Sequence, residues 1–282
     1  MSRIAYVNGA YRLLSQAAVN IEDRGFQFAD GVYEVCVVVD GKYWDLDGHI
    51  ARFWRSLGTL SIRAPIGEAA LGVVMRKVLR KNRLQDALVY IQATRGAAAR
   101  NHPFPDAARP SLIVTARPID MRQMEATARA GVRLISHPDI RWGRVDIKSV
   151  SLLPNVLAKQ AAKASGALEA MLVKNGAVTE GASSNMWIID AEGALVTHPL
   201  GTDILGGITR QTVIDCARTL QISVREKPFT VEEAKKAREV FLTSATNFVT
   251  PVISIDGEEI SDGAPGALSL KLRDAYIAHN RQ

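Results

Sequence analysis

The sequence predicts a two-domain protein of the α/β (α+β) class. Its 282 residues exceed an average domain of about 150 residues, which suggests two domains. Strand-like apolar runs alternate with segments of helical spacing in both halves, and such mixing indicates packed layers of sheet and helix. We place the junction where polar residues replace the strand-like pattern. The predicted organisation is a domain over 1–120, a linker over 121–131 and a domain over 132–282.

The first half is predicted to contain a sheet and two helices. Its opening apolar segments are short, and polar turn residues follow each of them. A run rich in β-branched residues ends at Asp40-Gly41, a dipeptide typical of hairpin turns, and a loop rich in Arg, Pro and Gly spans 95–110. The expected strands are 4–7, 12–14, 32–39, 42–45, 87–94 and 111–116, and the expected helices are 47–60 and 66–82.

The second half is predicted to mix strands and helices again. Asn175-Gly176 marks a turn, and Gly206-Gly207 precedes a segment of helical spacing. The expected strands are 132–137, 169–174, 184–190, 195–197, 224–228, 239–243 and 252–255, and the expected helices are 153–165, 209–220, 231–237 and 267–278.

Composition argues against several classes of protein. No run approaches the ~18 apolar residues that span a bilayer, and the first residues lack the apolar stretch of a signal peptide, so we expect a cytoplasmic protein with no membrane partner. The formal net charge is +6, but Lys and Arg do not cluster as nucleic-acid binding requires. The surplus instead favours anionic small substrates and a phosphorylated cofactor. The histidines form no metal pattern, and Cys36 and Cys216 are expected to be free thiols.

Lys148 is a candidate for covalent chemistry. It follows a predicted strand, precedes a predicted helix, and has the apolar neighbours Ile147, Val150 and Leu152. A lysine that forms a Schiff base must be partly desolvated, because burial favours the neutral amine that attacks a carbonyl. The alternative is a surface lysine whose stem lies along apolar neighbours.

Two further features have the properties of a cofactor site. Glu180 is expected in a turn of small residues between two strands, where a carboxylate could bind a protonated ring nitrogen and make the ring an electron sink. Gly206-Gly207-Ile208-Thr209 leads into a helix, and amide groups at a helix start bind anions such as phosphate. The segment 243–247 offers similar donors. The alternatives are an ordinary turn and an ordinary helix cap.

A fourth feature is the loop after Arg95-Gly96, which contains Arg100-Asn101-His102. A guanidinium group matches the geometry of a carboxylate, so this arginine and histidine could bind the carboxylate of a substrate. The alternative is a solvated basic loop. Together the four features supply a lysine, a partner for a ring nitrogen, a phosphate site and a carboxylate clamp.

The chain resembles the class IV (fold type IV) pyridoxal-phosphate aminotransferases along nearly its whole length. This family includes D-amino-acid aminotransferases, branched-chain aminotransferases, aminodeoxychorismate lyases and R-selective amine transaminases. The matching stretches occur in the order of the family: EDRGFQFADGVYEV (22–35), GHIARF (48–53), TRGAAARNHPFP (94–105), DIKSVSLLPNVLAKQ (146–160), VTEGASSNMW (178–187), ILGGITR (204–210) and EVFLTSATNFVTPV (239–252).

The resemblance implies a role for each matching residue. Lys148 would bind pyridoxal 5'-phosphate covalently and move the proton of the substrate α-carbon, and Glu180 would contact the pyridine nitrogen. The phosphate would be bound by Arg52, by Ile208 and Thr209, and by Ser244 and Ala245, while Leu205 would pack on the ring. The family further implies a small N-terminal and a larger C-terminal domain, and a homodimer.

The resemblance also bears on the substrate. Tyr33, Arg100 and His102 are similar to the carboxylate trap of the D-amino-acid enzymes, so we expect transamination of D-amino acids such as D-alanine or D-glutamate with pyruvate or 2-oxoglutarate. An L-branched-chain aminotransferase, an R-amine transaminase and an aminodeoxychorismate lyase are the alternatives, as is, outside enzymes, a protein that binds a phosphorylated ligand. Ala245 replaces a residue that usually carries a hydroxyl, which predicts slightly weaker cofactor retention. Phe248 stands where related sequences often have Glu, and the sequence offers no physical account of that change.

Overall fold

A computed structural model describes residues 3–281, which divide into two compact units. Unit 1 comprises the chain up to Asp120 together with Ile147–Ser151. Unit 2 comprises Met121–Asp146 and the chain from Leu152 onward. The short piece that contains Lys148 thus belongs to unit 1, although it lies within the sequence range predicted for the second domain.

Unit 1 is a six-stranded antiparallel sheet in the order β2-β1-β6-β5-β3-β4. Its strands are β1 (Ile4–Val7), β2 (Ala10–Leu13), β3 (Gly31–Val39), β4 (Lys42–Tyr43), β5 (Ala87–Thr94) and β6 (Ser111–Pro118). Its helices are η1 (Leu14–Gln16), α1 (Arg24–Phe28), α2 (Leu46–Thr59) and α3 (Glu68–Asn82). The short helix α1 was not predicted; Asp23 caps it by accepting a hydrogen bond from the backbone N–H of Gly25.

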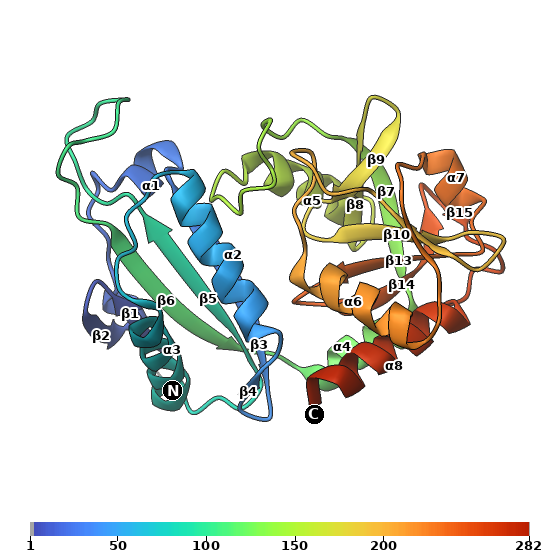
Figure 1. Ribbon diagram of the computed structural model, residues 1–282, viewed down its shortest axis with the longest axis horizontal. Helices are drawn as coiled ribbons and strands as arrows, with labels where there is room; N and C mark the ends of the chain where they lie inside the picture. The colour runs from blue at the N-terminus through green and yellow to red at the C-terminus, as the bar shows by residue number, and fades with distance from the viewer. Residues whose placement is uncertain (1–2, 282) are drawn as a thin grey trace. The chain divides into compact units, whose positions relative to one another are not determined.

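The two long helices cover one face of this sheet (Figure 1). Side chains alternate between the faces of a strand, and Cys36 and Val38 of β3 pack with Phe53 of α2 in the buried core. Tyr33 therefore projects to the opposite face, as do Tyr90 and Gln92 of β5. The helix-covered face is apolar, whereas the opposite face bears polar side chains.

Unit 2 contains a nine-stranded mixed sheet in the order β12-β11-β10-β13-β14-β7-β8-β9, with β15 paired to β14. Its strands are β7 (Val132–Pro138), β8 (Glu169–Lys174), β9 (Ala177–Gly181), β10 (Asn185–Ile189), β11 (Leu195–Thr197), β12 (Val224–Glu226), β13 (Glu239–Ser244), β14 (Phe248–Ile255) and β15 (Glu258–Glu259). Its helices are α4 (Met121–Ala130), α5 (Leu153–Ala164), α6 (Ile208–Thr219), α7 (Val231–Lys235) and α8 (Ala267–Arg281).

Packing in unit 2 positions the segments that carry candidate residues. Helix α5 packs on β8, while α6 and α8 pack on β13 and on each other. Residues 121–131, the predicted linker, are for the most part the helix α4, which contacts β14. The buried Ala128 gives this polar helix a point of attachment. No helix within residues 3–281 is long and apolar enough to cross a lipid bilayer.

Candidate active site

Lys148 lies against the edge of the unit 1 sheet, at the first residues of β3. The backbone N–H of Tyr33 donates to the carbonyl of Lys148 at 3.0 Å, and Val150 N–H donates to the carbonyl of Gly31 at 3.0 Å. These bonds extend the sheet by one short segment, with Ile147 buried in the core. The Lys148 side chain therefore emerges from a fixed backbone.

The amine of Lys148 lies over Tyr33. Its Nζ is 4.4 Å from the centroid of the ring and 3.4 Å from the phenol oxygen. Tyr33 in turn stacks on Tyr90, with the ring centroids 5.6 Å apart. Burial, with a further contribution from Tyr33, raises the pKa of Tyr90 to about 12. Tyr90 therefore remains neutral at ordinary pH, and Lys148 and Tyr33 meet as predicted for two active-site residues.

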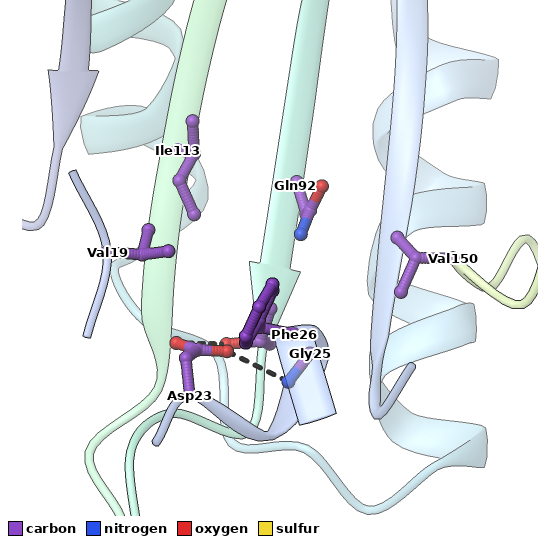
Figure 2. Close-up of a pocket in the computed structure, with 8 residues that line it drawn as sticks. Val19, Asp23, Gly25, Phe26, Gln92, Ile113 and Val150 are labelled. Atoms are coloured by element: carbon purple, nitrogen blue, oxygen red, sulfur yellow. Dashed lines mark hydrogen bonds between the residues drawn. The ribbon is translucent and has the colours of Figure 1, made fainter. Parts of the chain in front are cut away.

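A cavity of about 320 Å³ opens in unit 1 beside this segment. Figure 2 shows Gln92, Ile113 and Val150 directed toward it, with Phe26 at one end. Asp23 forms part of the lining and is fixed by the hydroxyl of Ser111, which donates to it at 2.6 Å. The unit 1 surface is thus hollowed two residues along the chain from Lys148.

On the helix-covered side of β3, Arg52 is paired with a buried carboxylate. Arg52 donates to Glu34 through Nε at 2.7 Å and through Nη2 at 2.9 Å, and His49 Nδ1 lies 2.8 Å from the same carboxylate. Burial alone would raise the pKa of Glu34, but the charge and hydrogen bonds of Arg52, aided by His49, lower it to about 2. Burial would lower the pKa of Arg52, and Glu34 raises it. The guanidinium group is therefore both charged and fixed in direction.

Sequence reasoning singled out Arg52 but missed Glu34 and His49. A signal was present: a lone carboxylate interrupts the apolar run of β3, and His49 and Arg52 are three residues apart on one helical face. A buried carboxylate requires a partner, and the adjacent helix supplies two.

In unit 2, Glu180 is a buried residue of β9, not of a turn as the sequence suggested. Its carboxylate accepts hydrogen bonds from Arg141 Nη1, from Asn185 Nδ2 at 2.9 Å and from the backbone N–H of Leu205 at 3.2 Å. Donors on three segments fix its orientation. A carboxylate with so many donors can accept from a ring N–H without losing its charge.

Arg141 is the second residue that sequence reasoning missed. Besides Glu180 it donates to Asp139, through Nη2 at 2.7 Å and Nε at 2.9 Å. Burial would lower the pKa of Arg141, but the hydrogen bonds of Asp139 and the charge of Glu180 raise it. Thr179 hydroxyl also donates to Asp139 at 2.7 Å. Arg141 is thus a buried permanent cation between two carboxylates.

The start of α6 has room for an anion. Thr209 is 2% exposed, and within residues 3–281 its hydroxyl oxygen has no hydrogen-bond partner. A Cβ on Gly207 would lie only 2.0 Å from Asn185 Oδ1, so the glycine lets this amide reach the loop. Asn185 Nδ2 also donates to the Leu205 carbonyl at 2.9 Å. A buried hydroxyl and free-ended helix amides fit a phosphate group.

Ser244 and Ala245 lie at the turn between β13 and β14. The hydroxyl of Ser244 accepts from the Asn247 N–H at 3.1 Å and lies 3.2 Å from the Thr246 hydroxyl. Ser244 therefore uses its side chain to shape the turn, and the contribution that this segment can make to an anion site comes chiefly from its backbone N–H groups.

Arg100 and His102 lie in an exposed loop of unit 1. Both approach Phe28, with 4.7 Å from the Arg100 guanidinium carbon to the ring centroid and 5.4 Å between the His102 and Phe28 centroids. Arg24 holds the loop by donating to the carbonyls of Asn101 and His102, at 2.6 and 3.0 Å. Over residues 3–281 no hydrogen bond joins Arg100 or His102 to Tyr33, so the three predicted carboxylate ligands are not brought together within this chain.

Comparisons with known proteins agree with this arrangement of residues. The chain is 41% identical to "D-alanine aminotransferase" of Bacillus licheniformis, over 95% of this chain and 94% of that one. It is 39% identical to the protein of the same name from Staphylococcus haemolyticus, over 96% and 95%. A branched-chain amino acid aminotransferase of T.th., solved with pyridoxamine 5'-phosphate, superimposes with a TM-score of 0.89 at 27% identity, covering 98% and 93%.

A branched-chain aminotransferase of Escherichia coli shares the fold, with a TM-score of 0.91 at 23% identity over 99% and 95% of the two chains. The family model described as amino-transferase class IV matches residues 31–255. The chain therefore belongs to the class IV aminotransferases, as its sequence motifs predicted.

Proposed function

We propose that this protein transfers the amino group of D-amino acids, such as D-alanine and D-glutamate, to a 2-oxo acid, with pyridoxal 5'-phosphate as cofactor. The observation that carries the proposal is the position of Asn185 in unit 2. This amide binds the carboxylate of Glu180 and also contacts the loop that leads to Thr209. A partner for a ring nitrogen and a site for a phosphate are thereby fixed to each other through one side chain.

The residues present fit this cofactor. The unpartnered, buried hydroxyl of Thr209 suits a phosphate oxygen, as do the N–H groups of Ile208 and Ala245. Ser244 would support them, Arg52 would add its charge, and Leu205 would lie against the ring. Lys148 would be the point of covalent attachment. When bound, pyridoxal phosphate withdraws electrons from the α-carbon of an attached amino acid.

The protein groups would supply the remaining chemistry. Glu180, held by Arg141 and Asn185, would keep a proton on the pyridine nitrogen. Lys148, once its amine is released, would remove the proton from the substrate α-carbon and return it elsewhere. Tyr33 would keep that amine in place, since its phenol oxygen already lies 3.4 Å from Nζ.

The substrate carboxylate would be bound by Tyr33, Arg100 and His102. The support for this assignment is that Arg100 and His102 share an exposed loop whose backbone Arg24 fixes, and that relatives at about 40% identity carry the name D-alanine aminotransferase. We further propose that the working form is a homodimer.

The attachment of the cofactor is tested by adding pyridoxal phosphate, reducing with borohydride and mapping the labelled peptide. We expect the label on Lys148, no label in Lys148→Ala, and normal labelling in Lys174→Ala, a matched control whose amine pairs with Asp203 at 2.6 Å. A label on a different lysine would contradict the proposal.

The substrate is tested with a panel of D-alanine, D-glutamate, L-leucine and R-1-phenylethylamine. We expect turnover of the two D-amino acids, and a KM for D-alanine at least about tenfold higher in Arg100→Met, because one charge-assisted pair to the carboxylate is lost. Arg117→Met, an exposed change at the end of β6, serves as control. The solved branched-chain enzymes of similar fold favour the second candidate, and turnover of L-leucine alone would establish it.

A further inference from the structure

The turn between β13 and β14 has an unusual backbone. Phe248 has φ +59°, a region that bulky side chains rarely adopt and that costs free energy. The residue is nevertheless fully buried. Such a conformation persists only when its surroundings enforce it, so the contacts around Phe248 have to hold the turn in shape.

Arg273 of α8 supplies one set of these contacts. Its Nη1 donates to the carbonyl of Asn247 at 2.9 Å and to the carbonyl of Val249 at 2.7 Å, one residue on either side of Phe248. The side chain is 1% exposed. Its Nε donates to Glu125 of α4 at 2.9 Å, and Figure 1 shows α4 and α8 side by side. The guanidinium group is thus committed to the turn and to α4.

The ring of Phe248 supplies the second set. It packs on Tyr276 with the ring centroids 5.4 Å apart, and the Arg273 guanidinium carbon lies 5.5 Å from the Phe248 centroid. Thr250 adds a hydrogen bond from its hydroxyl to the Asn247 carbonyl at 2.8 Å. Both carbonyls that flank the strained residue therefore face a cation, and the side chain between them is enclosed.

We propose that Arg273 and Phe248 are positioning residues for the phosphate group of the cofactor. They act on the turn whose first residues, Ser244 and Ala245, would face that group, so the inference rests on the proposed function. Because the Ser244 hydroxyl is engaged within the turn, and because Ala245 offers only its N–H, the direction of the backbone decides how well this segment binds an anion. The phenylalanine where relatives often have Glu thereby acquires a physical role.

The test compares the affinity of the protein for pyridoxamine phosphate with that for pyridoxamine, by fluorescence titration, together with the thermal unfolding of the unliganded protein. The ratio of the two Kd values isolates the phosphate, so a general loss of stability does not change it. In Arg273→Met we expect the preference for the phosphorylated compound to fall at least about fivefold, since two charge-assisted bonds to the turn are lost.

Two milder variants keep the test decisive if Arg273→Met does not fold. Phe248→Gly accepts the positive φ but removes the ring, and Glu125→Gln weakens the anchor of Arg273; each should lower the ratio about two- to fivefold. Arg129→Gln is the matched control, because Arg129 pairs with the same Glu125 at 2.6 Å and is 47% exposed, and its ratio should equal that of the wild type.

Each outcome separates the two ideas. A wild-type protein that prefers the phosphorylated compound, with the same ratio in all folded Arg273, Phe248 and Glu125 variants, would overturn the positioning role and leave the proposed function intact. A wild-type protein without any preference would overturn both. An equal fall in Arg129→Gln and Glu125→Gln would also overturn the positioning role, because it would trace the effect to α4 alone.

Discussion

Arg52 and Glu34 form a two-point ion pair, with Nε and Nη2 of the arginine 2.7 and 2.9 Å from the two carboxylate oxygens. Neither side chain is more than 7% exposed. Removing one member of such a pair leaves a buried charge without compensation, which typically costs about 3–5 kcal/mol. We expect Glu34→Gln to lower the free energy of unfolding by about that amount, measured by urea titration. Asp215→Asn, which breaks the exposed pair with Arg218, should cost less than about 1 kcal/mol.

The same carboxylate makes part of the stability depend on pH. Its pKa falls from an ordinary 4.5 to about 2 in the folded protein, so folding favours the ionised form. The contribution of Glu34 is fully present above about pH 5 and is lost as the pH falls toward its folded pKa. We expect the difference in unfolding free energy between wild type and Glu34→Gln to shrink over this acid range. A difference that stays constant down to about pH 3 would contradict the assignment.

Arg141 should be needed for cofactor binding. Arg141→Met leaves the buried carboxylates of Asp139 and Glu180 without their shared cation, and one of them would then take up a proton. We expect the Kd for pyridoxal phosphate, from absorbance titration, to rise at least about tenfold, with partial recovery in Arg141→Lys. Arg144→Met is the control, since Arg144 pairs with Asp146 at a site where its own side chain is 46% exposed. Equal affinity in Arg141→Met and wild type would rule out this role.

Gly207 should not tolerate a methyl group. A Cβ there would lie 2.0 Å from Asn185 Oδ1, and that amide is held by Glu180 and Leu205. Because the backbone of Gly207 has φ −66°, an alanine causes no backbone strain, and the clash alone decides the result. We expect Gly207→Ala to cost about 1–3 kcal/mol and to weaken cofactor binding. Gly206→Ala, whose Cβ would be an ordinary 3.6 Å from Leu200, should change neither quantity.

Local patterns were sufficient to predict the fold class and the family, and both are confirmed. The long elements followed from apolar spacing, as for β3, β5 and α5. Glu180 was wrongly expected in a turn, because its small neighbours resemble turn residues, whereas pairing of β9 with β8 makes the segment a strand. Strand pairing of this kind depends on tertiary context that propensity does not contain.

The polar networks could not be predicted from spacing. Arg141 and Glu180 are 39 residues apart in the chain, and Arg273 and Val249 are 24 apart. Such pairs form only after strands and helices have packed, so neither partner carries a local signal. The roles predicted for Lys148, Glu180, Arg52 and the carboxylate clamp remain predictions that the experiments above address.

The membership of Ile147–Ser151 in unit 1 has a consequence for dissecting the protein. The polypeptide passes from one unit to the other three times, so no single scission yields both units whole. A fragment ending at residue 120 would lack the segment that bonds to Gly31 and Tyr33, and the complementary fragment would carry that segment away with it. The reactive lysine is thus encoded in the midst of one unit and folded into the other, which argues that the two units were never independent modules.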